Sequence, residues 1–398
     1  MKHFRQLAIA AGLCALPLRP AAAQWTVTIL SPAGSMQSVS WACSNGGQAG
    51  EIVVGGVSRA CLWSGSAASW VDLQPAGATY GVARAASGGQ QAGYATVNDV
   101  IRASLWSGTA ASWVDLNPVG SMESVAWATA DGRQAGYVVM GGQIRASLWS
   151  GSAASWVDLS PTGSLGSEVF GAGAGQQVGY VLTGGGNHAS QWIGTAASWV
   201  DLNPAGSTDS IAWATSGSWQ AGWAVVGENG HAGVWNGTAG SWVDLNPTGS
   251  TYSEAFAAWG EHQAGVALVR GAYRASLWSG TSASWIDLSL FLPEGFTSSY
   301  GRGLSSDGAF LYVSGYGFNS LTGRQEALVW KQPMVAACYA NCDTSTAAPV
   351  LNVNDFQCFL NKFAANDAYA NCDQSTTQPA LNVNDFQCFL NSFAVGCP

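Results

Sequence analysis

The chain has 398 residues, and only 9% of them are charged. Acidic residues outnumber basic ones by 23 to 14, for a formal net charge of −9, which argues against nucleic acid and anionic membrane surfaces as partners. After the first 23 residues no stretch approaches 18 consecutive apolar residues, so no membrane span is expected.

The first 23 residues are organised like a secretory signal peptide. Lys2 and Arg5 precede an apolar run over residues 7–18, and three alanines at residues 21–23 form a small-residue cleavage site. Without this segment 11 basic and 23 acidic residues remain, a net charge of about −12. We therefore expect a secreted protein, extracellular or cell-surface associated, and residues 1–23 take no part in the expected fold.

Residues 24–332 are built from a repeat in which one strand of each copy ends in a tryptophan. The first six of these tryptophans stand 43 residues apart, and the seventh follows after 52. Each copy holds four short runs rich in Val, Trp, Tyr, Thr and Leu, separated by turn-forming residues, which is typical of strands. Four strands in about 40 to 45 residues predict a β-propeller blade. The tryptophans are Trp63, Trp106, Trp149, Trp192, Trp235, Trp278 and Trp330.

The strand types are not equally numerous along the chain. The strand that ends in tryptophan and the strand that carries Gly50 both occur seven times, whereas the Trp-Val-Asp-Leu strand follows only six tryptophans. An orphan strand of that last type lies at residues 27–30. We predict an all-β, seven-bladed β-propeller whose N-terminal strand completes the last blade, because closure removes exposed sheet edges.

After a linker at residues 333–337, residues 338–398 contain a shorter duplication with a period of 30 residues. Each copy ends in an apolar i, i+3, i+4, i+7 pattern, which predicts one amphipathic helix per copy. Six of the eight cysteines outside the signal peptide lie here, so we expect a small, disulfide-rich helical module.

Six cysteines allow fifteen pairings. In the preferred hypothesis, one disulfide joins each loop to its own helix, and a third joins the two ends of the module. Its pairs are Cys342 with Cys358, Cys372 with Cys388, and Cys338 with Cys397. Cys43 and Cys61 belong to the first blade, on strands separated by a third, so a bond between them requires that they meet at a sheet end.

The loop before each predicted helix carries oxygen-bearing side chains at alternate positions. A calcium ion takes six or more oxygens, and alternate positions of a tight turn can point inward together, as in the EF-hand loop that this segment resembles. The resemblance implies Ca²⁺ as a cofactor. The loop is longer than an EF-hand, lacks its glycine and has only two carboxylates, so turns held by disulfides without metal are the alternative. The candidate ligands are Asn341, Asp343, Ser345, Asn352, Asp355, Asn371, Asp373, Ser375, Asn382 and Asp385.

The propeller repeats resemble the extracellular HAF-family repeats, in which a His-Ala-Phe-Leu-Trp phrase, an Asp-Leu phrase and a Gly-Gln-x-x-Gly-Tyr phrase recur. These phrases appear here at residues 102–106, 115–116 and 175–180. His188 and His231 occupy the family's histidine column, which holds arginine in four other copies. For the repeats, the resemblance implies no reaction.

The tail resembles a GC-type dockerin-like module, here with Gly396 and Cys397 at its end. This resemblance implies an anchoring role through protein contacts, with a cohesin-like protein or a cell-surface receptor as partner.

Variation between the copies marks the candidate ligand site. The loops that lead into the innermost strands differ from copy to copy, and in a propeller these loops ring one mouth of the central channel. Two arginines also replace the aromatic residue that Trp41, Trp127 and Trp213 supply. The alternative is ordinary surface variation. The candidate ligand-binding residues are Tyr80, Arg84, Glu123, Asp209, Tyr252 and Arg302.

The repeated residues themselves are poor candidates for chemistry. An aspartate that recurs in six blades is expected to be a turn or strand-end acceptor, and the recurring tryptophans are expected to be core, because an active site normally breaks the symmetry of its scaffold.

We therefore expect a non-enzymatic secreted scaffold, with a propeller face that binds a glycan or protein and a tail that anchors it. One alternative is an extracellular polysaccharide-acting enzyme with Glu123 and Asp209 as its carboxylate pair at the channel mouth. A purely structural surface protein is another.

Overall fold

The computed structural model describes residues 25–334, 339–343, 345, 349–373, 375 and 379–396. The predicted signal peptide and the predicted bond between Cys338 and Cys397 lie outside these residues.

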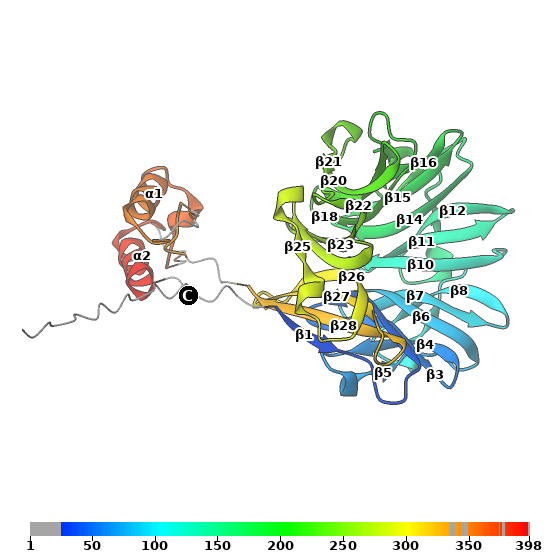
Figure 1. The fold of residues 1–398 in the computed structure, drawn as a ribbon. Coiled ribbons are helices and arrows are strands. Elements are labelled where there is room, and N and C mark those ends of the chain that lie inside the picture. Colours follow the sequence, from blue (N-terminus) through cyan, green and yellow to red (C-terminus); the bar gives the residue numbers. More distant parts are fainter. Residues whose placement is uncertain are drawn as a thin grey trace, which may run out of the picture.

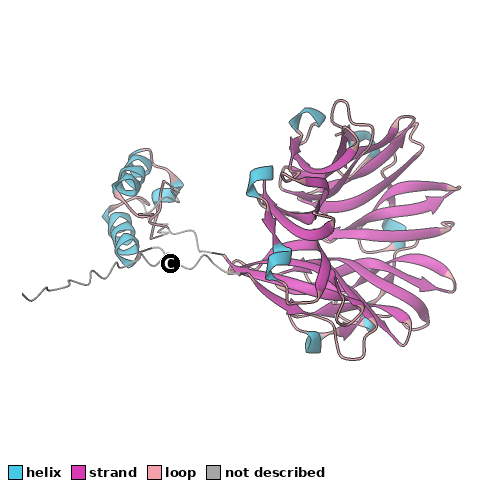
Figure 2. Ribbon diagram, in the orientation of Figure 1, coloured by secondary structure: helices cyan, strands magenta, loops and turns pink. Residues whose placement is uncertain are grey.

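Residues 25–334 fold into seven four-stranded antiparallel sheets (Figures 1 and 2). The first strands of these sheets together line a central channel. From the channel outward, the first four blades are β2 (Gln37–Ser44), β3 (Gly47–Val54), β4 (Val57–Trp63) and β5 (Val71–Asp72); β6 (Ala78–Ser87), β7 (Gln90–Val97), β8 (Val100–Trp106) and β9 (Val114–Asp115); β10 (Glu123–Ala130), β11 (Arg133–Met140), β12 (Gln143–Trp149) and β13 (Val157–Asp158); and β14 (Gly166–Gly173), β15 (Gln176–Thr183), β16 (Gly186–Trp192) and β17 (Val200–Asp201).

The other three blades follow the same order. They are β18 (Ser210–Ser216), β19 (Trp219–Val226), β20 (Asn229–Trp235) and β21 (Val243–Asp244); β22 (Ser250–Trp259), β23 (His262–Val269), β24 (Ala272–Ser279) and β25 (Ile286–Asp287); and β26 (Phe296–Ser306), β27 (Phe310–Asn319), β28 (Arg324–Pro333) and β1 (Thr26–Ile29). Short 3₁₀ turns link the two outer strands within a blade: η1 (Ala67–Ser69), η2 (Ala110–Ser112), η3 (Ala153–Ser155), η4 (Ala196–Ser198), η5 (Ala239–Ser241) and η6 (Ser282–Ser284). Another 3₁₀ turn, η7 (Leu288–Phe291), lies between β25 and β26.

The two ends of the propeller segment pair in the last blade, so the predicted seven-bladed fold and its closure are confirmed. Strand β1 runs antiparallel to β28, with Thr28 opposite Val329 and Ile29 opposite Leu328. Beyond the strand, the Leu30 backbone N–H donates to the Ala327 carbonyl at 2.8 Å. In Figure 1 the blue strand β1 lies beside the orange β28.

The core lies between neighbouring blades. All seven repeated tryptophans are buried, with at most 1% of their surface exposed, as predicted. Trp106 of the second blade packs in one cluster with Ala49, Ala60 and Leu73 of the first. Each blade thus buries its apolar surface against the next, which is why a single blade has no core of its own.

The repeated aspartates act as strand-end acceptors, as predicted. In the second blade Asp115 accepts a hydrogen bond from Arg102 at 2.8 Å through one oxygen and from the Asn117 backbone N–H at 2.8 Å through the other. The fourth blade has His188 in place of the arginine, 2.8 Å from Asp201. The same pairing joins Arg59 to Asp72, Arg145 to Asp158, His231 to Asp244 and Arg274 to Asp287.

Cys43 and Cys61 are buried free thiols. Strand β3 lies between their strands, so they do not meet at a sheet end. Burial raises the pKa of both thiols, which keeps them protonated and unreactive.

The tail contains α1 (Val353–Ala364), η8 (Ala368–Ala370) and α2 (Val383–Val395). Phe359 and Phe389, one from each helix, are fully buried and stack with their ring centroids 4.2 Å apart. Disulfides join Cys342 to Cys358 and Cys372 to Cys388, two of the three pairs of the preferred hypothesis. No helix in the described part of the chain is long and apolar enough to cross a membrane.

Candidate ligand site in the central channel

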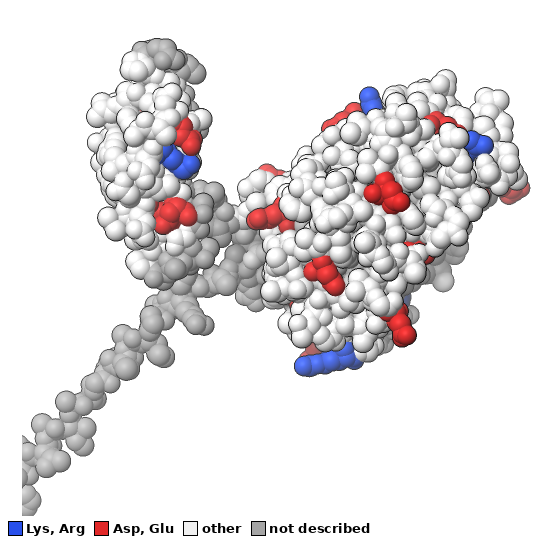
Figure 3. All heavy atoms as spheres, turned by 90° about the horizontal axis from the view of Figure 1, so that it is seen from above, with Lys and Arg blue, Asp and Glu red and all other residues white. Residues whose placement is uncertain are grey.

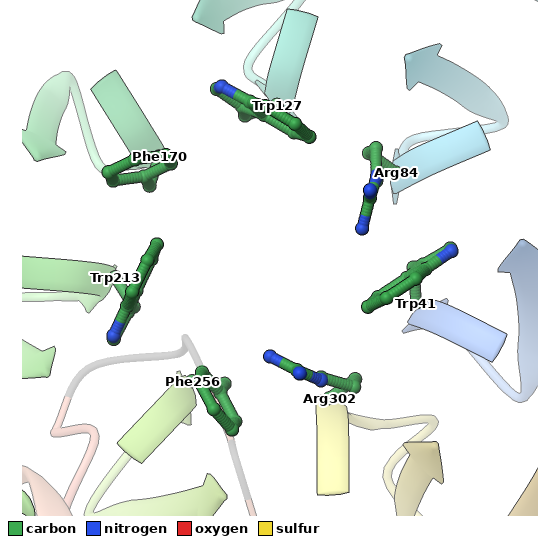
Figure 4. Close-up of a pocket in the computed structure, with 7 residues that line it drawn as sticks. All are labelled: Trp41, Arg84, Trp127, Phe170, Trp213, Phe256 and Arg302. Atoms are coloured by element: carbon green, nitrogen blue, oxygen red, sulfur yellow. The ribbon is translucent and has the colours of Figure 1, made fainter. Parts of the chain in front are cut away.

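Each innermost strand contains a β-bulge, and the bulge residue points into the channel. In the first blade Ser40 pairs with Gly50 and Ala42 with Ala49, which leaves Trp41 without a partner on β3. A bulge bends the strand and turns one side chain away from its normal direction. Figure 4 shows the seven bulge residues converging on one space. We call them the channel ring: Trp41, Arg84, Trp127, Phe170, Trp213, Phe256 and Arg302.

The channel ring has a cationic side and an aromatic side. The guanidinium carbon of Arg84 lies 3.8 Å from the ring centroid of Trp41, and that of Arg302 lies 5.3 Å from the same centroid. On the opposite side Phe170 and Trp213 pack with their centroids 4.4 Å apart. The cavity between these side chains has a volume of about 330 Å³, within the lower part of the range for small-molecule sites.

Neither arginine of the channel ring forms a salt bridge among the described residues, although Arg302 lies close enough to Glu254 to lower the pKa of that carboxyl group. The Nε atom of each is buried and has no hydrogen-bond partner in the described part of the chain. Arg302 makes a long hydrogen bond of 3.5 Å to the hydroxyl of Tyr316. Contacts with aromatic faces hold the two cations instead, since Arg302 also lies 3.8 Å from the Phe256 centroid.

Two glutamates beside the channel ring have strongly raised pKa values. Burial raises the pKa of Glu168 to about 7, with a further increase from Glu123 and a decrease from the indole of Trp127. Burial likewise raises the pKa of Glu254 to about 7, against the opposing effects of Arg302 and Trp213. Each carboxylate can therefore exchange a proton near neutral pH.

The sequence analysis missed these two glutamates. A usable signal was present, because Glu168 and Glu254 occupy a column that holds Val39, Val82, Val125, Ile211 and Tyr300 in the other blades. An acid in an otherwise apolar column indicates a buried carboxyl group.

Of the six predicted ligand-binding residues, Arg84 and Arg302 lie in the channel ring. Tyr80 reaches the ring indirectly: its hydroxyl donates to Glu51 at 3.3 Å, and Glu51 accepts from the Trp41 indole N–H at 3.3 Å. This chain of contacts links a residue of the variable loop region to an aromatic wall of the cavity.

The other three predicted residues lie near the same strand ends, outside the ring. Glu123 accepts a hydrogen bond from the Tyr137 hydroxyl at 3.0 Å. Asp209 has one buried oxygen that finds no partner among the described residues, and burial raises its pKa against the opposing effect of Asn187. Tyr252 packs beside Gly230, where an added Cβ would lie 2.8 Å from its ring. The structure therefore does not bring Glu123 and Asp209 together in the ring.

We expect Glu168→Gln to change how stability depends on pH. The raised pKa favours the neutral carboxyl in the folded state, so its stabilisation is complete below about pH 4.5 and is lost as the pH rises through about 7. The variant stays neutral. Its free energy of unfolding relative to the wild type should therefore rise by about 2 kcal/mol between pH 5 and pH 8, measured by urea denaturation. Glu228→Gln, in an exposed turn, is the control, and a change of the same size there would refute the expectation.

The predicted calcium loops have a partly suitable set of donors. Among the described residues, the buried side-chain oxygens of Asn341 and Asn371 find no hydrogen-bond partner, which suits them to bind a cation. Asp355 is buried and accepts hydrogen bonds from the Asp343 and Asn352 backbone N–H groups, at 3.2 and 2.9 Å. The described residues contain no cluster of three or more His, Cys, Asp or Glu side chains arranged to hold a metal.

Two predicted ligands serve as helix caps. The Asn352 side chain accepts from the Asn354 backbone N–H at 2.8 Å, and Asn382 accepts from Asn384 at 2.9 Å. Each also forms a capping box with the aspartate three residues later. Helix capping is therefore sufficient to explain why asparagine and aspartate occupy these positions, without a metal.

No known family model matches the chain, and no curated protein matches its sequence. Solved structures are similar in fold. The β-propeller domain of the Trilobed protease from Pyrococcus furiosus, described as having an open velcro topology, is 9% identical with a TM-score of 0.50, over 77% of this chain and 97% of that one.

Two further structures match less closely. Puromycin hydrolase is 11% identical with a TM-score of 0.47, over 77% of this chain and 55% of its own. TolB from Acinetobacter baumannii is 12% identical with a TM-score of 0.42, over 62% of this chain and 64% of its own. The chain thus spans less than two thirds of either protein. The comparisons agree with the β-propeller fold, and the resemblance to HAF repeats and to a dockerin-like module stays a prediction.

Proposed function

We propose that this protein is a secreted, non-enzymatic binding scaffold: the propeller holds a ligand at the channel ring, and the tail anchors the protein to a partner. The observation that carries the proposal is the channel ring itself. Two arginines that form no salt bridge within the described part of the chain and five aromatic side chains converge on one cavity, and such groups recognise ligands by charge and by stacking.

The position of the ring supports a binding role. Each ring residue comes from the bulge of a different blade, so seven rigid strands hold the cavity walls. A site built on strands needs little ordering when a ligand arrives, which favours affinity.

Features of the tail support an anchoring role. Val353 and Val383 begin the two helices at equivalent positions and are 77% and 78% exposed. Exposed apolar side chains on a disulfide-tied module suit contact with another protein. One calcium ion in each loop, bound by Asn341 in the first and by Asn371 in the second together with neighbouring oxygens, would fix the loops, so we propose that this contact depends on calcium.

Capture from spent culture medium tests both parts. The immobilised full chain should retain a protein partner in calcium but not in EGTA, and a chain that ends at Met334 should retain none. Trp41→Ala should abolish retention of the ligand of the propeller while the tail partner stays bound. Equal capture with and without the tail would contradict the anchoring role. Calcium must also raise the melting temperature of the full chain.

A polysaccharide-acting enzyme is the second candidate, since Glu168 and Glu254 have pKa values near those of a catalytic acid. It requires reducing-sugar release that Glu168→Gln or Glu254→Gln abolishes. The same experiment decides against it if the wild type releases no sugar from any polysaccharide that it binds.

A further inference from the structure

We propose that the channel ring binds a uronic acid residue, with the sugar carboxylate between Arg84 and Arg302 and the sugar ring against the aromatic side. This inference rests on the proposed binding function of the propeller and specifies its ligand.

The charge requirement comes from the two arginines. Arg84 and Arg302 lie on either side of Trp41, as Figure 4 shows, and the Nε atom of each is buried with no partner among the residues that the structure describes. A buried polar N–H without a partner costs free energy, and a guanidinium is the side chain best suited to hydrogen-bond a carboxylate. A ligand with one carboxylate at this side of the cavity satisfies both cations.

The shape of the ligand is constrained by the aromatic side of the cavity, opposite the arginines. Trp127, Phe170, Trp213 and Phe256 present aromatic surfaces there, and Arg302 covers the last of them. The C–H faces of a sugar ring pack well on such surfaces. The cavity of about 330 Å³ is large enough for one sugar residue and too small for a folded peptide segment.

The remaining polar groups favour a sugar over an aromatic acid. Within the described residues, the buried indole N–H groups of Trp127 and Trp213 make no hydrogen bond of ordinary length. They nevertheless lie close enough to Glu168 and Glu254 to lower the pKa of these carboxyl groups as hydrogen-bond donors. Sugar hydroxyls both donate and accept hydrogen bonds, so a hydroxyl can bridge each indole N–H and its neighbouring carboxyl group, whereas an aromatic acid without hydroxyl groups cannot.

The surface of the protein carries few positive charges that could attract an anionic ligand. Charged side chains are sparse on the face shown in Figure 3, and the net charge of the chain is negative. An anionic ligand therefore depends on the two ring arginines for its binding.

Isothermal titration calorimetry on the full chain tests the inference. The titrants are galacturonate, its trimer and the methyl esters of both, at constant ionic strength. We expect the acids to bind about 10-fold or more tightly than the esters. Arg84→Gln and Arg302→Gln should each weaken binding of the acids about 10-fold and leave binding of the esters unchanged. Arg133→Gln, an exposed arginine outside the channel ring, is the matched control.

Three results overturn the inference: equal affinity for acid and ester, no effect of either arginine variant in a protein that melts like the wild type, or tight binding of phenylacetate in place of the uronates. Absence of any uronate binding also overturns it. The proposed function then still stands if Trp41→Ala removes a ligand that the wild type captures from the medium, and falls with the inference if it does not.

Discussion

Gly136→Ala is expected to destabilise the propeller by about 3 kcal/mol or more, because an alanine methyl group has no room at that position. A Cβ built on Gly136 would lie 1.9 Å from the carbonyl oxygen of Val125 on the innermost strand. The obstacle is backbone, so a rotamer change does not relieve it. Equivalent glycines in the other blades show the same approach, at 1.8 to 2.0 Å.

Urea denaturation and the melting temperature measure this effect, and Gly240→Ala is its control. Gly240 has no atom within 4 Å of an added Cβ, and alanine occupies the equivalent position in other copies, for example Ala111. That substitution should leave the free energy of unfolding unchanged or raise it by about 0.4–1 kcal/mol. Equal stability of the two variants would show that the strands do not approach as closely as described.

This glycine also bears on the candidate site. Gly136 pairs with Ala126, next to the bulge that turns Trp127 into the channel. Enlarging the glycine should therefore disturb the direction of the ring residue as well as the packing of the blade. The close approach of the two strands at this glycine thus both stabilises the blade and sets the direction of a side chain that lines the cavity.

Leu30→Ala is expected to lower the free energy of unfolding by about 2–5 kcal/mol. This loss should equal that of the same substitution in a blade whose four strands are consecutive in sequence. Leu30 follows β1, is fully buried, and packs in a cluster with Ala327 and Val329 of the last blade. If the closure holds in solution, removing this side chain leaves a cavity in a packed interior.

Leu116→Ala is the matched control, because Leu116 occupies the equivalent place in the second blade. It is also fully buried, and its backbone N–H donates to Ala103 at 2.8 Å, as that of Leu30 does to Ala327. The two losses should agree within about 1 kcal/mol. A nearly neutral Leu30→Ala beside a costly Leu116→Ala would mean that β1 is detached and the ring is open.

The fold could be predicted because its signals are local and repeated. The 43-residue spacing, the glycine and tryptophan columns and the orphan strand at residues 27–30 together predicted seven blades and their closure. The apolar spacing of Phe356 and its neighbours likewise predicted a helix in each half of the tail. Both patterns depend on residue order alone.

The candidate site was predictable only in part. Arg84 and Arg302 stood out because each replaces an aromatic residue of a repeated column, and the structure places both in the channel ring. Glu123 and Asp209 also varied between copies, but variation alone does not say which side chains share a cavity. The ring includes Phe170 and Phe256, which conform to the column and therefore showed no signal.

The sequence by itself determined the number of blades, the partner of the N-terminal strand and the apolar column that forms the core, because each follows from a repeated pattern of apolar and turn-forming residues. Tertiary structure alone decided that Trp41 and its equivalents face the channel, since that direction depends on a bulge in the pairing of two strands. It also decided that Glu168 and Glu254 titrate near neutral pH, because burial by neighbouring blades raises the pKa of each carboxyl group.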